Sequence, residues 1–154
     1  MIAYILYICI VLFLTYLGYF LAGKHRLAKK FYASWDKFHQ FFLSEVEYTR
    51  RPLDEVLKRF EDEGDFSGFL KEYRNNHKIE NSIDFLSKEE NEFLKEYFSF
   101  LGKSDYTAQR EYFNANTKKL NDYKLKSEQN AVKYTDLYVK LGFLLGLIIV
   151  ILLI

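Results

Sequence analysis

The sequence predicts an all-α protein: a bundle of about five or six helices flanked by an N-terminal and a C-terminal transmembrane helix. All 22 Lys and Arg residues and all 21 Asp and Glu residues lie between Lys24 and Lys140, so both ends of the chain are apolar. Between the apolar ends, apolar residues recur at helical spacing, the only proline is Pro52, and no alternating strand-like run occurs. One soluble domain is therefore expected between two membrane segments.

Residues 1–23 are predicted to form the first transmembrane helix. Ile2 to Gly23 contains no charged residue and would measure about 33 Å as a helix, enough to cross the ~30 Å hydrocarbon core. Gly18 and Ala22 are small residues four positions apart and favour close contact with another helix. The alternative, a cleaved signal peptide, is disfavoured because the segment lacks a basic start and its apolar block is too long.

Residues 141–154 are predicted to form a short second transmembrane helix. All fourteen residues are apolar or glycine, and they span about 21 Å as a helix, or about 27 Å if Leu137 is included and Lys140 snorkels. Gly142 and Gly146 favour packing against another membrane helix, either the first span or a channel partner. A re-entrant or groove-buried helix is the alternative.

Residues 24–140 are predicted to form the soluble domain on the cytoplasmic side of the membrane. The positive residues that follow the first span come before the first acid, Asp36, and Lys also outnumbers Asp and Glu before the tail. The positive-inside rule places such flanks in the cytoplasm. The basic flanking residues are Lys24, Arg26, Lys29 and Lys30 on one side and Lys118, Lys119, Lys124, Lys126, Lys133 and Lys140 on the other.

Two helices are predicted before Gly64. The first continues directly from the first span and ends near Pro52, which becomes the first residue of the second helix. The apolar stripe of the first helix is Phe31, Trp35, Phe38, Phe42, Val46 and Thr49. The apolar face of the second is Leu53, Val56, Leu57 and Phe60, and Gly64 is its expected stop.

Three more helices are predicted in the rest of the domain. A short helix carries Phe66, Phe69, Leu70 and Tyr73, and residues 74–82 form a loop. Ser87 and Glu90 have the spacing of a capping box, which opens a helix that ends at Gly102. Its apolar residues are Phe93, Leu94, Tyr97, Phe98 and Leu101. Ser104 or Asp105 then caps a long helix that starts at Tyr106 and runs into the tail.

The long helix carries a heptad pattern that is rich in amide residues. Its first set of positions is Tyr106, Phe113, Leu120, Ser127, Tyr134 and Leu141, and the second is Gln109, Asn116, Tyr123, Asn130 and Leu137. This pattern predicts a helix that packs partly on its own bundle and partly on a partner. A bundle helix with a solvated polar edge is the alternative.

No catalytic, cofactor-binding or metal-binding residues are predicted. His25, His39 and His77 lie on different expected elements, and no phosphate-binding loop or nucleophile motif is present. The acidic run 61–65 lacks the pattern of a calcium loop. Glu45 and Glu47 are interpreted as surface or partner-binding carboxylates, and the lone Cys9 as an apolar filler. Neither a nucleic-acid partner nor a small-molecule substrate is expected.

Four stretches, in order along the whole chain, resemble the stage III sporulation protein AB family of endospore-forming bacteria. The first is the N-terminal span with Gly18 and a basic exit. The second is 45–57, which is similar to the family's acid-x-x-Tyr-x-x-x-Pro-Leu segment and contains Glu45, Tyr48 and Pro52. The third is 100–109, similar to its Leu-Gly-x-x-Asp-x-x-x-Gln turn with Gly102, Asp105 and Gln109, and the fourth is 140–146 before the apolar end.

The resemblance implies a non-enzymatic membrane component of the channel complex that links mother cell and forespore after engulfment. The family's helical domain is similar to the inner-membrane platform protein F of type II secretion. By that analogy the chain would lie in the outer forespore membrane of the mother cell, its partners being other membrane subunits and a cytoplasmic ATPase. Gly102, Asp105 and Gln109 would shape a turn between helices. The alternative function is a generic membrane-anchored adaptor in cell division or envelope assembly.

Overall fold

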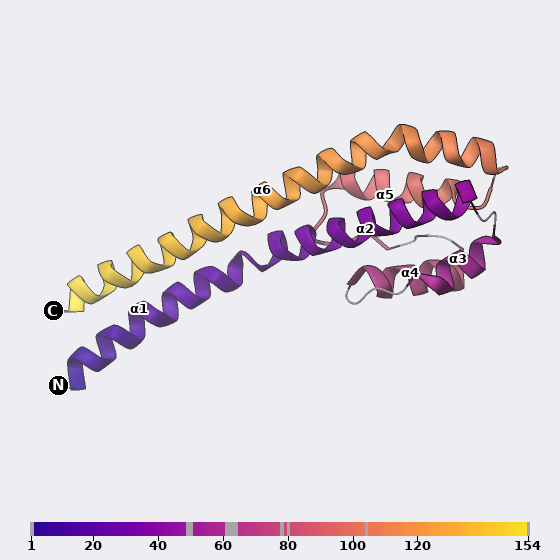
Figure 1. Cartoon of the computed structure of the whole chain (residues 1–154). Helices are drawn as coiled ribbons and strands as arrows, with labels where there is room; N and C mark the ends of the chain where they lie inside the picture. Colours follow the sequence, from indigo (N-terminus) through magenta and orange to yellow (C-terminus); the bar gives the residue numbers. More distant parts are fainter. Residues whose placement is uncertain are drawn as a thin grey trace. The chain divides into compact units, whose positions relative to one another are not determined.

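Six α-helices form the part of the chain that the computed structural model describes, which is residues 2–48, 51–60, 65–77, 79, 81–103 and 105–153 (Figure 1). They are α1 Ile2–Leu21, α2 Gly23–Tyr48, α3 Leu53–Arg59, α4 Asp65–Asn76, α5 Lys88–Phe100 and α6 Tyr106–Leu153. No strand occurs in these residues, so the all-α prediction is confirmed.

The chain divides into two compact units, which are described one at a time. The paired-helix unit consists of Met1–Lys29 and Lys126–Ile154. The bundle unit consists of Lys30–Leu125. Both α2 and α6 contribute residues to each unit, because these two helices cross the unit boundaries.

A break at Ala22 separates α1 from α2, whereas the sequence predicts one continuous helix. The backbone N–H of His25 donates to the carbonyl of Ala22 at 3.1 Å, a bond that is one residue shorter than in an α-helix. The Arg26 guanidinium donates to the carbonyl of Tyr19 at 2.9 Å. Gly23 adds to the break because glycine is a poor residue for a helix interior. The side chain of Arg26 thus caps the end of α1, where a positive charge is favourable.

The bundle unit has an aromatic core centred on α2. The predicted stripe of α2 is buried from Phe31 to Val46, while Thr49 lies outside the described residues. The Trp35 ring lies 5.4 Å from that of Phe93 and 5.2 Å from that of Tyr97, both on α5. Such ring pairs contribute about 0.5–1.5 kcal/mol each beyond the burial of their area. The core therefore fixes α2 against α5.

The boundaries of α3 and α4 differ from the prediction. Pro52 occupies the N-cap position before α3 rather than the first helical position. The helix α3 ends at Arg59, and Phe60 follows in an extended conformation, while Gly64, the expected stop, lies outside the described residues. The helix α4 continues to Asn76, so the predicted loop at 74–82 begins later.

The predicted capping box at the start of α5 is confirmed. The Ser87 hydroxyl accepts from the N–H of Glu90 at 3.3 Å, and the Glu90 carboxylate accepts from the N–H of Ser87 at 2.7 Å. Gly102 follows α5 with a φ of 74°, a left-handed conformation that favours glycine. At the start of α6, the Asp105 carboxylate accepts from the N–H of Ala108 at 2.8 Å, whereas Ser104 lies outside the described residues.

The heptad pattern describes the buried face of α6 only over part of its length. Phe113, Leu120 and Ser127 are buried, but Leu141 is 45% exposed. A straight α-helix rotates by about 20° per heptad, so four heptads after Phe113 the position has turned roughly 80° away. At that point of α6, the buried residue is Gly142, next to the exposed Leu141. The buried face of α6 thus changes from large apolar residues to small ones.

His39 is a buried polar residue that connects three helices of the bundle unit. Its Nδ1 lies 2.9 Å from the Tyr97 hydroxyl on α5, and its Nε2 lies 2.8 Å from the Thr117 hydroxyl on α6. Burial lowers the pKa of His39 from 6.5 to about 4, so the imidazole is neutral at physiological pH. The pair of hydrogen bonds satisfies both ring nitrogens in the core.

We predict that acid destabilises the bundle unit through His39. The lowered pKa means that the unfolded chain takes up a proton more readily than the folded one. The contribution of His39 is therefore complete above about pH 6.5 and is lost as pH falls toward 4, by roughly 3 kcal/mol in total. Urea unfolding of the full chain in detergent micelles, followed by near-ultraviolet circular dichroism, measures this loss. His39→Gln should flatten the pH dependence of the free energy of unfolding, whereas His77→Gln, at an exposed residue, should leave it unchanged. The same pH dependence in the wild type and both variants would contradict the role of His39.

Candidate functional site

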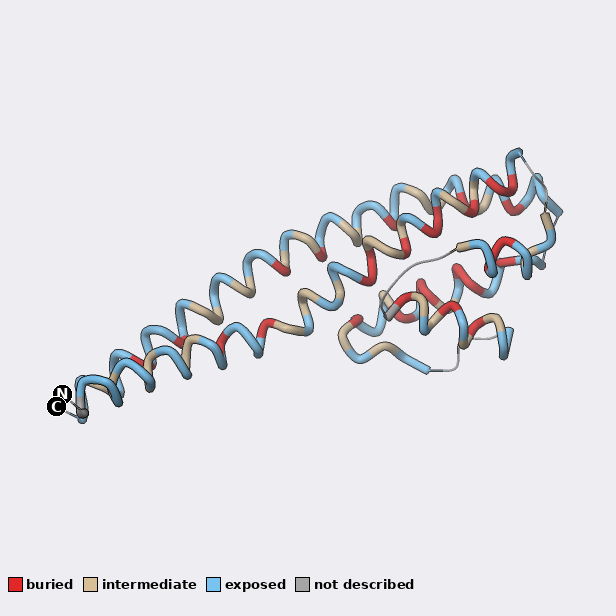
Figure 2. Tube along the Cα trace, turned by 60° about the horizontal axis from the view of Figure 1, so that its bottom comes forward, coloured by how far each residue is buried: buried red, intermediate tan, exposed pale blue. Residues whose placement is uncertain are grey.

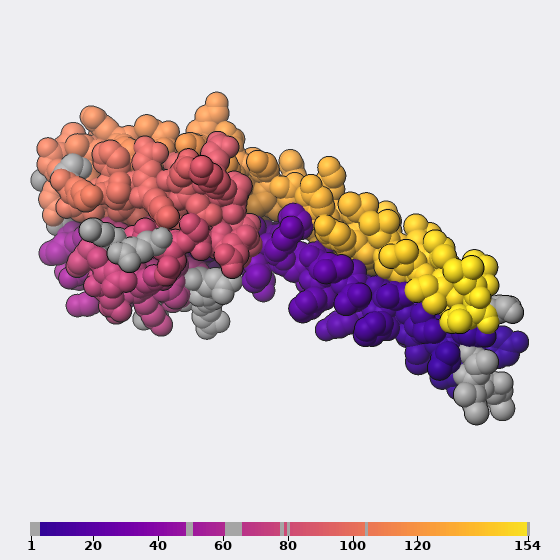
Figure 3. All heavy atoms as spheres, turned by 180° about the vertical axis from the view of Figure 1, so that it is seen from behind, coloured from indigo at the N-terminus to yellow at the C-terminus, as the bar shows by residue number. Residues whose placement is uncertain are grey.

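In the paired-helix unit, α1 and the C-terminal half of α6 lie side by side and antiparallel (Figures 1 and 3). The two chain ends lie at the same end of this pair. The Tyr7 hydroxyl donates to the carbonyl of Leu153 at 3.5 Å. Beyond the break, the His25 ring stacks on the Tyr134 ring with centroids 4.1 Å apart. Contacts therefore extend along the length of the unit.

Three glycines bring the two backbones together. A Cβ atom added at Gly18 would meet the carbonyl oxygen of Tyr138, and one added at Gly142 would meet the carbonyl oxygen of Leu14. A Cβ at Gly146 would lie 2.9 Å from the Cα of Val11. The sequence left open whether Gly142 and Gly146 contact the first span or another protein, and the structure places them against α1. Ala22, the other predicted packing residue, is fully buried at the break.

These contacts define one antiparallel register. Val11 faces Gly146, Leu14 faces Gly142, and Gly18 faces Tyr138, so each step up α1 is matched by a step down α6. By the same count, Lys24 stands level with Lys133, and Lys140 stands level with Leu17, inside the uncharged stretch of α1. The charged ends of the two helices are thus offset by about 10 Å.

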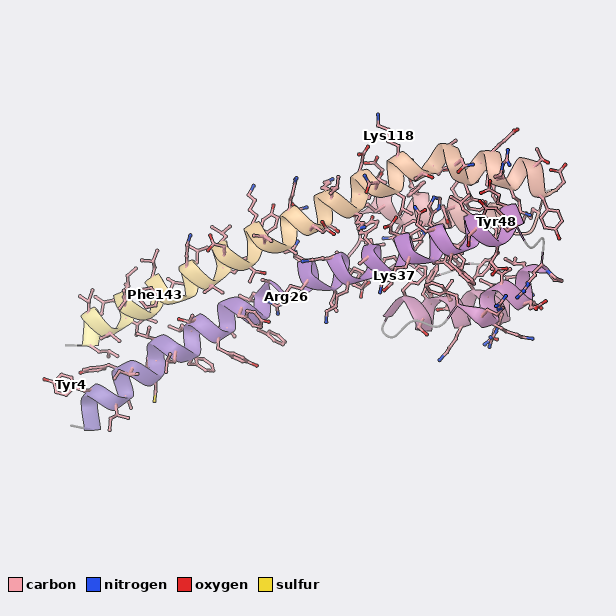
Figure 4. All side chains as sticks on the ribbon, viewed as in Figure 1. Tyr4, Arg26, Lys37, Tyr48, Lys118 and Phe143 are labelled. Atoms are coloured by element: carbon pink, nitrogen blue, oxygen red, sulfur yellow. The ribbon has the colours of Figure 1, made fainter. Side chains whose placement is uncertain are left out.

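Both members of the pair are candidate membrane-spanning helices. Each contains an apolar window long enough to cross a bilayer, and only 11% of each window is buried inside the protein. Leu12, Phe20 and Ile151 are 63%, 68% and 72% exposed, and Phe143 is one of many exposed apolar residues on α6 (Figures 2 and 4). A core helix of a soluble protein would bury these side chains. Cleavage of α1 as a signal peptide would also uncover the glycine face of α6.

A second feature, in the bundle unit, is a surface cavity of about 260 Å³ that we call the turn pocket. It lies where the turn before α3 meets the turn between α5 and α6. Its walls combine apolar side chains with a few polar groups at two helix starts. The lining residues are Phe42, Val46, Arg51, Pro52, Leu53, Val56, Gly102, Asp105, Tyr106 and Gln109.

Four of the six residues singled out in the sequence line the turn pocket: Pro52, Gly102, Asp105 and Gln109. The Gln109 side-chain oxygen accepts from the backbone N–H of Gly102 at 3.3 Å, while the Asp105 carboxylate caps α6. A Cβ at Gly102 would lie 2.7 Å from a methyl carbon of Leu53. The two turns are therefore in direct contact through a glycine.

The other two predicted residues, Glu45 and Tyr48, lie outside the lining of the pocket. The Glu45 carboxylate is almost buried and lies 3.8 Å from Nε of Arg51 and 3.5 Å from a guanidinium nitrogen of Arg59. It therefore makes ion pairs within the chain. Tyr48 is 79% exposed at the last turn of α2 (Figure 4). Glu47 is also exposed.

Sequence reasoning did not single out Arg51 and Tyr106 as pocket residues. Arg51 precedes Pro52 and pairs with Glu45, so an arginine six residues after a carboxylate was the available signal. Tyr106 is the first residue of α6 and is 41% exposed. Its role in the pocket depends on where α6 starts relative to α3, which no local pattern specifies.

The described residues contain no group of three or more His, Cys, Asp or Glu side chains placed to hold a metal ion. His25 is stacked on an aromatic ring and His39 is buried in the core. Residues 61–64 of the acidic run lie outside the described part of the chain. The glycine contact of the paired helices and the turn pocket are the two features of the described residues that bring predicted site residues together.

We predict that Gly102→Ala destabilises the bundle unit by roughly 1–3 kcal/mol, because alanine is strained at a φ of 74° and its Cβ would press on Leu53. Gly68→Ala is the matched control. Gly68 lies inside α4 with nothing within 4 Å of an added Cβ, so there alanine should stabilise the helix by about 0.5–1 kcal/mol. Urea midpoints of the full chain in micelles measure both effects. If Gly102→Ala and Gly68→Ala shifted the urea midpoint in the same direction, the role of Gly102 would be refuted.

We also predict that Gly142→Leu with Gly146→Leu separates the paired helices, since both added side chains would meet the backbone of α1. Overpacking of this kind costs roughly 1–3 kcal/mol per site. Separation is measured as the loss of energy transfer between fluorophores at the two chain ends during titration with SDS in mixed micelles. The leucine variant should lose the transfer at a lower fraction of SDS than the wild type. Leu144→Ala with Ile151→Ala, on the exposed face, should leave the transition in place. An unchanged transition in the leucine variant would show that the glycine contact does not hold the pair.

Comparison with known proteins identifies a family for the chain. The family model of stage III sporulation protein AB matches residues 3–154. That range includes both candidate membrane helices and all residues of the turn pocket. Neither the curated proteins nor the solved structures contain a match to the chain. Because the family model covers nearly the whole sequence, the chain belongs to the stage III sporulation protein AB family.

Proposed function

We propose that this protein is a non-enzymatic assembly component of the channel complex that joins mother cell and forespore. Membership of the family gives it a role in stage III of sporulation. In the proposal, α1 and the C-terminal half of α6 anchor the chain in the outer forespore membrane. The bundle unit lies in the mother-cell cytoplasm, as the excess of Lys and Arg beside both apolar segments favours.

The observation that carries the proposal is the turn pocket. Two stretches that resemble the family's motifs, 45–57 and 100–109, supply most of its lining, although they are far apart in the sequence. Their meeting produces a concave, partly apolar surface beside exposed tyrosines, rather than a cluster of groups suited to acid–base or nucleophilic chemistry. Such a surface supports binding of another protein.

The surroundings of the turn pocket have the composition of a protein–protein interface. Tyr48 and Tyr106 are exposed, and Arg51 is held in place by its ion pair with Glu45. Tyrosine and arginine are enriched among the residues that dominate binding energy at interfaces. The proposed partners are the other membrane subunits of the channel complex and its cytoplasmic ATPase, and the turn pocket is proposed as the place where one of them docks.

We predict that Tyr48→Ala with Tyr106→Ala weakens this docking without unfolding the domain. Loss of two exposed aromatic anchors should lower co-purification of the ATPase and channel subunits from membranes of sporulating cells by on the order of tenfold. Heat-resistant spores should fall in parallel. Leu125→Ala, an exposed apolar change elsewhere in the bundle unit, is the matched control and should behave as wild type.

Normal co-purification and normal spore counts in the double tyrosine variant would reject the docking role of the turn pocket. Deletion of the gene separates the proposed function from a general adaptor. The proposal requires normal vegetative growth and a block after engulfment. A defect in vegetative division would instead favour an adaptor in cell division or envelope assembly.

A further inference from the structure

Charge is segregated between the two units of the chain. The paired-helix unit contains six Lys and Arg residues and two Asp and Glu residues, a net charge of +4. The whole chain carries +1, so the remaining residues sum to −3. The positive charge is therefore concentrated on the helices that carry the apolar segments. These charges are Lys24, Arg26, Lys29, Lys126, Lys133 and Lys140, opposed by Glu128 and Asp136.

Three of the lysines form a stripe on α6. Lys126, Lys133 and Lys140 are seven residues apart and thus share one face of the helix, and all three are exposed. Successive lysines along the stripe are separated by about 10 Å. In the antiparallel register, Lys24 on α2 stands level with Lys133, so both helices contribute cations at the same height.

The lysines differ in how far they are already engaged. Lys140 lies 2.7 Å from the Asp136 carboxylate, but both side chains are mostly exposed, at 70% and 60%. Lys133 lies 5.7 Å from the centre of the Tyr134 ring. Lys24, Lys29 and Lys126 make no ion pair with any described residue. Arg26, by contrast, is committed to Tyr19, whose carbonyl it caps and whose ring it covers at 3.6 Å. We therefore define the basic collar as the five lysines: Lys24, Lys29, Lys126, Lys133 and Lys140.

The position of the collar relative to the apolar surface selects its ligand. The uncharged N-terminal stretch ends at Gly23, the first residue of α2, and that of α6 begins at Leu141, directly beside the collar. Tyr16 and Tyr19 are 66% and 47% exposed at this level, as expected of residues at a membrane interface. Lys24 and Lys133 therefore stand at the depth of lipid headgroups, and Lys140, about 10 Å closer to the chain ends, reaches that depth by snorkelling. Lys29 and Lys126 are about 10 Å further out, within roughly one Debye length of the surface.

We propose that the basic collar is a binding site for anionic phospholipids, which it recruits to the leaflet on the polar side of the paired helices. Phosphatidylglycerol-type headgroups carry the negative charge that suits these lysines, of which only Lys140 makes an ion pair with a described residue. A protein segment would have to displace lipid from the adjoining apolar surface, whereas headgroups reach the collar without doing so. The proposal rests on the two-span topology of the proposed function.

The test uses the full chain reconstituted in phosphatidylcholine vesicles with trace spin-labelled phosphatidylglycerol or phosphatidylcholine. Electron paramagnetic resonance measures the fraction of each lipid that is immobilised on the protein. In low salt, phosphatidylglycerol should associate with the protein on the order of fivefold more strongly than phosphatidylcholine. In roughly 0.5 M salt the Debye length is only about 3–5 Å, so screening should reduce this preference. Lys126→Gln, Lys133→Gln and Lys140→Gln together should remove most of the preference.

A matched control removes the same charge elsewhere. Lys88→Gln, Lys103→Gln and Lys118→Gln change three exposed lysines of the bundle unit and should retain the preference. Replacing the three stripe lysines with arginine should also retain it, which separates loss of charge from loss of folding. Equal immobilisation of the two lipids by the wild type, or equal losses in the stripe and control variants, would overturn the collar. No immobilised lipid of either kind would instead refute the two-span topology.

Discussion

The close contact between α1 and α6 is the interaction on which the rest of the structure depends. Gly18, Gly142 and Gly146 have no side chain, and a Cβ at any of them would collide with the backbone of the opposite helix. In a bilayer, apolar side chains gain little by leaving lipid, so helix association relies on close packing of this kind. The contact also gives the short apolar tail a neighbour, because the C-terminal half of α6 packs along α1 rather than standing alone. It fixes the register of the two helices and hence the relative heights of the charges along them.

A rigid interior complements this contact in the bundle unit. The rings around Trp35 and Phe98 fill the core, and His39 ties α2 to Tyr97 and Thr117 with both of its nitrogens. A neutral, fully hydrogen-bonded histidine adds specificity of packing because any shift of one helix would leave a buried nitrogen unpaired. Such a core suits the proposed role, in which the turn pocket is a fixed docking surface.

Short sequence patterns were sufficient to predict the features that depend only on neighbouring residues. The capping box at Ser87, the glycine that ends α5 and the stripe of α2 each follow from a few neighbouring residues. The break at Ala22 has only one local signal, Gly23, because the Arg26 side chain that caps the end of α1 reaches back seven residues to Tyr19. The change of the buried face along α6 follows from the mismatch between 3.6 residues per turn and a repeat of seven.

Long-range pairing accounts for the rest of what the sequence did not specify. A pair of small residues indicates that another helix approaches closely, but it does not specify which helix. The sequence therefore allows two partners for Gly142, and in the structure the partner is α1. The turn pocket likewise requires Leu53 and Gln109 to meet at Gly102, which only the tertiary fold provides. Membrane topology and docking depend on the bilayer and on partner proteins, which lie outside the chain.

The most direct measurement of the central contact is the distance between the two chain ends in a bilayer. Spin labels at Tyr4→Cys and Ile151→Cys, in a Cys9→Ala background, report it by double electron–electron resonance in nanodiscs. Antiparallel helices with axes about 8–10 Å apart predict a narrow distribution centred at roughly 20–25 Å, including the label arms, and independent of protein concentration. A broad distribution beyond about 40 Å, more than the thickness of the hydrocarbon core, would contradict the pairing of α1 with α6.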